Sequence, residues 1–171
     1  MLMGKTERVL ERREKAMKEK RIMIAYISKH RGNTYKIAKV ISNELGAEIK
    51  KAEEVAPEEL LNYDLIGLGS GIYAFGMHGK IKKLLKKSGN GNGKKVFLIS
   101  TSGDPNGSKY HKGVKKILEK KNFKLVGEFN CPGAYYPWLL FGKKGINADR
   151  PNSEDIEKAK EFAREIMEKW I

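Results

Sequence analysis

Residues 28–34 (SKHRGNT) have the chemistry of a phosphate-binding loop. They follow a short apolar run and lead directly into a helical pattern, so backbone N–H groups gather at a helix start. Ser28 and Thr34 add hydroxyls at the two ends of the loop, and Gly32 between them lets an anion approach the backbone closely. Together these groups could bind a phosphate. The same residues are ordinary helix caps, so a plain strand-to-helix turn is the alternative. The loop has neither Gly-Lys-Ser/Thr nor Gly-x-Gly-x-x-Gly, which argues against ATP and dinucleotides.

Two further loops combine small residues, hydroxyls and aromatic rings. Residues 69–78 (GSGIYAFGMH) place glycines around Tyr73 and Phe75, and glycine lets the backbone approach a flat ligand on which a ring can stack. The alternative is that both rings fill the core. Residues 100–104 (STSGD), with Tyr110 downstream, suit the edge of a ligand ring, although the Asp-Pro pair at 104–105 also fits a simple turn.

The elements that position these loops alternate between short apolar runs and helical periodicity, which predicts an α/β fold with a parallel sheet. Ligands of such doubly wound sheets bind beyond the carboxyl ends of the strands, where these loops begin. The predicted strands are residues 22–27, 47–52, 64–71, 95–101 and 123–131, with a bulge near Gly127 in the last. The predicted helices are residues 33–45, closed by Gly46, a short helical turn at 57–61, then 80–87, 110–121 and a last helix from Ser153.

The two ends of this pattern differ from the rest. Residues 1–20 form a predicted appended, charged helix, and residues 21–171 form the domain. The thin apolar seam of the first helix fits a solvated helix, packing on the domain or a weak dimer contact. Residues 132–152 are long and irregular, and contain Tyr135, Tyr136, Trp138 and Phe141.

Composition excludes several classes of protein. One cysteine, Cys131, cannot form an internal disulfide, and three dispersed histidines give no zinc-site spacing. We expect Cys131 to be a small buried apolar residue. No apolar stretch reaches the length of a signal peptide or a membrane span, so we expect no membrane span and a cytoplasmic location.

The three loops together resemble those of the flavodoxin family, over almost all of the chain beyond Arg21. The segment IAYISKHRGNTYKIA resembles the flavodoxin loop that holds the phosphate of FMN, and YDLIGLGSGIYAFGMH and VFLISTSGDPNGSKYH resemble the two loops around the isoalloxazine ring. The segments GEFNCPG and INADRPNSEDIEKAKEFA resemble a prokaryotic subgroup with a long loop before the last helix. The resemblance implies five parallel strands in the order 2-1-3-4-5, helices on both faces and FMN as the cofactor.

The resemblance also assigns roles to residues. The Gly71 peptide would face flavin N5, Tyr73 would stack on the ring, with Phe75 as the alternative, and Tyr110 would cover the other face. The residues implied at the phosphate are Ser28, His30, Gly32, Asn33 and Thr34. Those implied along the ring are Ser70, Gly71, Ile72, Tyr73 and Ala74, with Thr101, Ser102 and Gly103 at the pyrimidine edge.

The charge of the chain departs from the family, whose electron carriers are usually acidic. With 35 basic and 21 acidic residues, the net charge is 35 − 21 = +14, and lysines crowd residues 76–95 and 109–124. This surface fits a merely solvated face, steering of an acidic redox partner such as a ferredoxin-like iron–sulfur protein, or an anionic small molecule. Nucleic-acid binding ranks last, because no recognition motif accompanies the charge.

An FMN-binding electron-transfer protein is therefore the leading hypothesis, with no catalytic residue assigned. The first alternative is an FMN-dependent reductase that takes hydride from NAD(P)H and reduces a quinone or another small acceptor, with the aromatic residues of 132–152 walling its pocket. The second is a flavin-free protein of the same fold that binds an acidic partner through its lysine-rich face.

Overall fold

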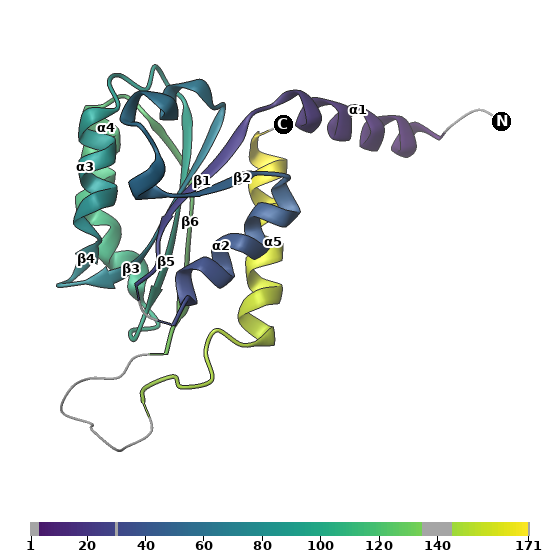
Figure 1. Ribbon diagram of the computed structural model, residues 1–171. Helices are drawn as coiled ribbons and strands as arrows, with labels where there is room; N and C mark the ends of the chain where they lie inside the picture. The colour runs from purple at the N-terminus through teal and green to yellow at the C-terminus, as the bar shows by residue number, and fades with distance from the viewer. Residues whose placement is uncertain (1–3, 30, 135–144, 171) are drawn as a thin grey trace.

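Five parallel strands and one short antiparallel strand make a sheet with helices on both faces (Figure 1). The computed structural model describes residues 4–29, 31–134 and 145–170. The strands are β1 (Ile22–Ile27), β2 (Glu48–Lys51), β3 (Leu65–Tyr73), β4 (Gly76–Met77), β5 (Lys95–Ser102) and β6 (Lys124–Pro132). The helices are α1 (Lys5–Glu19), α2 (Asn33–Leu45), α3 (Gly79–Lys87), α4 (Lys112–Lys120) and α5 (Ser153–Trp170), with short 3-10 helices η1 (Ala52–Glu54), η2 (Pro57–Asn62) and η3 (Gly107–His111).

The order of the parallel strands is β2-β1-β3-β5-β6, which confirms the predicted order of five strands. The sixth strand, β4, pairs antiparallel with the end of β3 and was not predicted. It has only two residues, and its turn, Ala74 and Phe75, lacks the glycine or asparagine that signals such a hairpin. Both turn residues nevertheless have positive φ, 45° and 61°, so β3 and β4 hold a strained hairpin at the end of the sheet.

Alternate side chains of the buried strands supply two separate cores. In β1, Ile22 and Ile24 face α2 and α5, whereas Met23 and Ala25 face the layer of α3 and α4. The strands are apolar on both faces because helices cover both sides of a parallel sheet. Figure 1 shows α2 and α5 on one side of the sheet and α3 and α4 on the other.

Two glycines that the sequence marked have clear structural roles. Gly46 ends α2 in the left-handed conformation, with φ 61° and its N–H donated to the Ser42 carbonyl. The register between β5 and β6 shifts just before Gly127, as the predicted bulge requires. A Cβ at Gly127 would lie 2.5 Å from Ile166 Cδ1, so the glycine also lets α5 pack closely on β6.

Three element boundaries differ from the predictions for local reasons. The helix predicted at 110–121 begins at Lys112, because residues 107–111 form the 3-10 helix η3. The predicted helical turn at 57–61 is the 3-10 helix η2, and the predicted strand at 47–52 is shortened to β2, because η1 begins at Ala52. None of these shifts moves a strand within the sheet.

The first helix projects away from the sheet (Figure 1). Val9 and Leu10, from its predicted apolar seam, are 46% and 54% exposed. This matches the predicted appended helix. Among the helices in residues 4–29, 31–134 and 145–170, each is too short or too polar to cross a membrane.

Gly67 in β3 provides a test of the packing in the core between the sheet and the helices α2 and α5. A Cβ there would lie 2.5 Å from Phe97 Cζ and 2.9 Å from Ile24 Cγ1, so Gly67→Ala should lower the free energy of unfolding by about 1–3 kcal/mol through overpacking. Urea titration followed by circular dichroism measures the loss. Gly69→Ala is the matched control, because its nearest neighbours lie 3.5 Å away. Equal stabilities of the two variants would contradict this packing.

Candidate functional site

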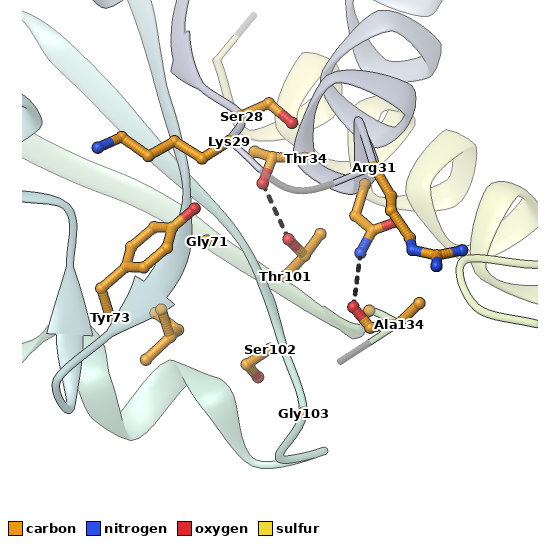
Figure 2. Close-up of a pocket in the computed structure, with 13 residues that line it drawn as sticks. Ser28, Lys29, Arg31, Thr34, Gly71, Tyr73, Thr101, Ser102, Gly103 and Ala134 are labelled. Atoms are coloured by element: carbon orange, nitrogen blue, oxygen red, sulfur yellow. Dashed lines mark hydrogen bonds between the residues drawn. The ribbon is translucent and has the colours of Figure 1, made fainter. Parts of the chain in front are cut away.

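The loops at the carboxyl ends of β1, β3, β5 and β6 surround one cavity of about 390 Å³ (Figure 2). β1 and β3 are neighbours, but the chain continues from β1 to β2 on one side and from β3 to β5 on the other. The loops after β1 and β3 therefore separate and leave a crevice. The cavity is lined by Ser28, Lys29, Arg31, Asn33, Thr34, Gly71, Ile72, Tyr73, Thr101, Ser102, Gly103, Gly133 and Ala134. Two of these residues are cationic and none is acidic, so the lining favours an anionic ligand.

The α2 end of the cavity presents a helix N-terminus whose cap residue has no side chain. Gly32 is the N-cap, with φ 70°, and follows Arg31 at φ 51°, so two consecutive residues are left-handed. The first turn of α2 has no acidic residue and no side-chain hydrogen bond from the cap. The Tyr35 N–H donates to Ser28 Oγ at 3.4 Å, a long bond. These N–H groups give the end of the cavity a partial positive charge.

Two side chains of this first turn fix α2 to the ends of the neighbouring strands. Thr34, which is buried, shares a hydrogen bond between its Oγ1 and Thr101 Oγ1 at 2.9 Å. Asn33 Nδ2 donates to the Ala134 carbonyl at 3.2 Å. Figure 2 draws both hydrogen bonds as dashed lines. The position of the helix terminus is therefore set by β5 and by the residues after β6.

Tyr73 forms the side of the cavity at the end of β3. Its ring lies over the backbone of Gly71, where a Cβ would be 3.0 Å from the Tyr73 hydroxyl. The ring meets His78 edge-on, with centroids 5.2 Å apart. Burial raises the pKa of Tyr73, and a hydrogen bond with the Lys29 backbone opposes the rise. Gly71 thus permits the Tyr73 ring to lie against the backbone in the lining of the cavity.

The carboxylate of Asp104 holds the loop after β5 in place through three contacts. It accepts from the Asn106 N–H at 2.8 Å, from the Tyr110 hydroxyl at 3.0 Å and from Lys109 Nζ at 2.6 Å. The lysine, followed by the backbone bond and the tyrosine, lowers the pKa of Asp104 to about 2. The Asp-Pro pair at 104–105 is therefore a turn whose aspartate also holds Tyr110, as one of the two alternatives expected.

Most of the residues predicted to bind a cofactor meet at this cavity. Nine of the fourteen line it: Ser28, Asn33, Thr34, Gly71, Ile72, Tyr73, Thr101, Ser102 and Gly103. Four others, Gly32, Ser70, Ala74 and Tyr110, are not part of its lining. His30 lies outside the described residues, as do Tyr135, Tyr136, Trp138 and Phe141. The cofactor contacts assigned to all these residues stay predictions.

The four residues outside the lining have other places in the structure. Ser70 is fully buried, donates to the Gly71 carbonyl at 2.7 Å and accepts from the His78 N–H at 3.0 Å, so it braces the hairpin. Gly32 and Ala74 shape the turns described above. Tyr110 contacts Phe75, with ring centroids 6.1 Å apart, and Phe75 is 82% exposed at the hairpin tip.

Four residues that line the cavity were not among those predicted from the sequence. Lys29 and Arg31 stand inside the predicted phosphate loop, and their charge was a usable signal for an anion site. Gly133 and Ala134 follow β6, where the segment GEFNCPG was compared with the family but was given no contact with the cofactor. Cys131, just before them, is 2% exposed, and burial raises its pKa to about 12, as expected of an apolar core residue.

Comparison with known proteins identifies the family. The family model described as a flavodoxin domain matches residues 23–146, most of the chain. An uncharacterized protein of Methanocaldococcus jannaschii is 48% identical over 149 residues, which cover 85% of this chain and 97% of that protein. The chain therefore belongs to the flavodoxin family, as its loops indicated.

Solved structures give the same fold. Oxidised flavodoxin 2 of Bacillus cereus superposes with a TM-score of 0.66 at 24% identity, covering 87% of this chain and 99% of that one. A flavodoxin from the domain Archaea gives 0.65 at 17% identity, covering 88% and 98%. A flavoprotein of Lactobacillus acidophilus, solved in complex with FMN, gives 0.50 at 21% identity, covering 65% and 93%. The order of strands thus belongs to a flavodoxin-like fold.

The Thr34–Thr101 hydrogen bond should stabilise the folded protein. Either Thr34→Val or Thr101→Val leaves the other buried hydroxyl without this partner, and we expect each to lower the free energy of unfolding by about 1–3 kcal/mol. The double variant should lose less than the sum of the two single losses, because both partners of one bond are then gone. Urea unfolding of all four proteins measures the coupling. Strictly additive losses would show that the two hydroxyls do not interact.

Proposed function

We propose that this flavodoxin-family chain binds FMN in the cavity and serves as an electron-transfer protein. The observation that carries the proposal is the division of the cavity into two chemically different ends. One end has the uncapped α2 terminus with Lys29 and Arg31 and suits an anionic tail, and the other has glycine backbone beside Tyr73 and suits a flat ring. A phosphorylated flavin has both parts, and the fold is that of flavodoxins.

The phosphate of FMN fits the donors at the α2 end. Backbone N–H groups of the first turn would bind its oxygens, and the hydroxyls of Ser28 and Thr34 would supply further donors. The Thr34 hydroxyl can accept from Thr101 while it donates to the phosphate, so the hydrogen bond between the two threonines would be kept. Lys29 and Arg31 add positive charge at the cavity rim, where they also raise the local concentration of anions.

The ring fits between the loops that follow β3 and β5. The backbone of Gly71 and Ile72 would border one side and Tyr73 would stack on a face, while Thr101, Ser102 and Gly103 would border the opposite edge. When bound, the flavin supplies the redox chemistry, and the protein supplies position and electrostatic surroundings. Burying the ring against these loops would also restrict the access of water to it.

Comparing FMN with riboflavin tests the two ends separately. Ser28→Ala and Thr34→Val should weaken FMN binding by about tenfold to a hundredfold, because each removes a hydrogen bond to a charged phosphate. Riboflavin has no phosphate, so its affinity should stay nearly constant in both variants. Tyr73→Leu should weaken both ligands alike. Quenching of flavin fluorescence gives each dissociation constant.

Asn43→Ala is the matched control for these variants, because Asn43 is an exposed polar residue of α2 that does not line the cavity. It should leave both affinities unchanged. Equal losses of FMN and riboflavin affinity in Ser28→Ala and Thr34→Val would contradict a phosphate at the α2 terminus. If wild-type protein bound neither ligand at micromolar concentration, the redox function itself would fail.

We also propose an acidic redox protein as the partner, contacted through a lysine surface on α3 and α4. These two helices pack against each other on the same face of the sheet (Figure 1). The lysine surface consists of Lys83, Lys86, Lys87, Lys112, Lys116 and Lys120, which are all exposed. Within the part of the chain that the structure describes, these six make no ion pair, whereas Lys80, Lys109 and Lys115 do. Their charge is therefore available to an acidic surface.

The lysine surface adjoins the hairpin that borders the cavity. Lys82 Nζ would lie 3.3 Å from a Cβ at Gly76, so α3 contacts β4 directly. The tip of the same hairpin carries the exposed Phe75. An apolar side chain beside a cationic face is suited to a partner with an acidic rim around an apolar contact. A ferredoxin-like iron–sulfur protein has the required negative charge.

Charge reversal tests the partner. Lys83→Glu with Lys116→Glu should slow electron exchange with an acidic iron–sulfur protein by about tenfold at low ionic strength, because the steering field is weakened. The difference should shrink as salt is added, since screening shortens the field to about 10 Å at 0.1 M. Lys39→Glu, an exposed lysine of α2 on the other face, is the control for one charge reversal. Stopped-flow absorbance measures the rates, and salt-independent rates equal to wild type would contradict the assignment.

A further inference from the structure

A continuous chain of polar side chains runs from the cavity wall into the molecule. It begins at Ser102, which lines the cavity, and continues through Asn130 and Ser100 to His111 and Glu128. The residues come from β5, β6 and η3, which contact one another here. None of them was needed to explain the fold or to hold the phosphate.

His111 lies between Ser100 and Glu128 in this chain and is its one histidine. Its ring is fully buried, with Nε2 at 2.7 Å from Ser100 Oγ and Nδ1 at 2.9 Å from Glu128 Oε1. Ser100 Oγ also lies 2.9 Å from Asn130 Oδ1. Ser100 has a single hydroxyl hydrogen, so it can donate either to His111 or to Asn130, but not to both.

The orientation of Asn130 limits the arrangements. Its Nδ2 donates to the Pro105 carbonyl at 3.0 Å, so its Oδ1 faces the serines and can only accept. Two hydroxyls can donate to that oxygen, Ser100 at 2.9 Å and Ser102 at 3.2 Å. Ser102 has a second acceptor in the Asp104 carbonyl, at 2.5 Å.

With a neutral ring, the hydrogens have one consistent arrangement. Nδ1 carries the proton, because Glu128 beside it is an acceptor, and Nε2 then accepts from Ser100. Asn130 Oδ1 has lost Ser100 as its donor and depends on Ser102. With a neutral ring, the Ser102 hydroxyl therefore donates to Asn130.

A second proton on the ring reverses this arrangement. Nε2–H now donates to Ser100 Oγ, so the Ser100 hydroxyl must turn to its other acceptor, Asn130 Oδ1. Asn130 no longer depends on Ser102, whose hydroxyl is free to donate elsewhere. Each hydroxyl keeps a partner in both states, so the change needs only rotation of hydrogens.

The surroundings keep the chain close and set the charge at His111. Gly107 of η3 packs directly on it, because a Cβ there would clash with Asn130 Oδ1 and lie 2.5 Å from Ser102 Oγ. The charged groups facing the ring are Glu128 of β6 and Lys115 of α4, which bridge at 3.2 Å. β4 has no ionisable side chain, and β5 contributes Ser100. Burial lowers the pKa of His111, and Glu128 opposes this in part.

We propose that His111 is a positioning residue of the cavity, whose proton determines whether the Ser102 hydroxyl is needed by Asn130 or can donate to a ligand in the cavity in place of the Asp104 carbonyl. A ligand that presents an electron-rich acceptor to Ser102 then binds more tightly when His111 is protonated. This step rests on the proposed function: reduced FMN is such a ligand, because reduction adds negative charge to the edge of the ring that we place beside Ser102. By linkage, bound reduced FMN raises the proton affinity of His111 by the same factor.

The first experiment uses the protein without flavin. Histidine ring signals are followed by NMR as the pH is lowered, and the His111 signal is assigned by its loss in His111→Asn. In Ser102→Ala the neutral state leaves Asn130 Oδ1 without a donor, so the pKa of His111 should rise by about one unit, a tenfold gain in proton affinity. Adding Ser100→Ala should abolish that difference. Ser88→Ala, a buried serine bonded to the Leu85 carbonyl, is the matched control and should cause no shift.

The second experiment measures the ratio of the affinities for reduced and oxidised FMN between about pH 5 and about pH 8, a range that spans the ordinary histidine pKa. Because reduced FMN also titrates in this range, the ratio is compared between proteins: on acidification it should increase in wild type and in His78→Asn relative to His111→Gln and Ser102→Ala. An unchanged His111 pKa in Ser102→Ala would overturn the proposal, as would the same pH dependence of the ratio in wild type and in both of the latter variants. Wild type that binds no FMN would overturn the proposed function instead, and the flavin-free titration would still decide the role of His111.

Discussion

The N-terminus of α2 can serve as an anion site only because parallel strands bring separate loops to one edge of the sheet. The strand order reverses between β1 and β3, which leaves a crevice at this edge, and α2 begins in it. The shared hydrogen bond between Thr34 and Thr101 then links the first turn of α2 to β5. The cavity, the uncapped backbone groups and the wall at Ser102 all depend on this junction between helix and sheet.

Positive charge acts at two distances from that junction. At the cavity, Lys29 and Arg31 accompany the helix terminus and favour an anionic ligand. On the far side of the sheet from α2, the lysine surface of α3 and α4 gives the molecule a field that reaches an approaching protein. The proposed anion site and the surface proposed for an acidic protein are thus built from separate residues, and each can change without the other.

The sequence predicted the sheet well because buried parallel strands leave long apolar runs and the helices leave a clear period. It did not predict β4, since two residues carry no periodicity and the turn at Ala74 and Phe75 uses unfavourable conformations. Much of the cavity lining after β1, β3 and β5 was predicted, whereas Gly133 and Ala134 after β6 were not. Two predicted residues have other contacts, because Ser70 bonds to backbone atoms and Tyr110 bonds to Asp104. The His111 chain could not be seen at all, because its members are separated in sequence and meet only through β5 and β6.

Phosphorus NMR of FMN mixed with the protein tests the central claim most directly. A phosphate held by the α2 terminus should give a separate signal whose position stays constant between about pH 5.5 and about pH 8, because bound phosphate remains fully ionised whereas free phosphate titrates near pH 6. A signal that keeps the position of free FMN and titrates with it would show that the cavity does not hold the phosphate, and would contradict the account of this site.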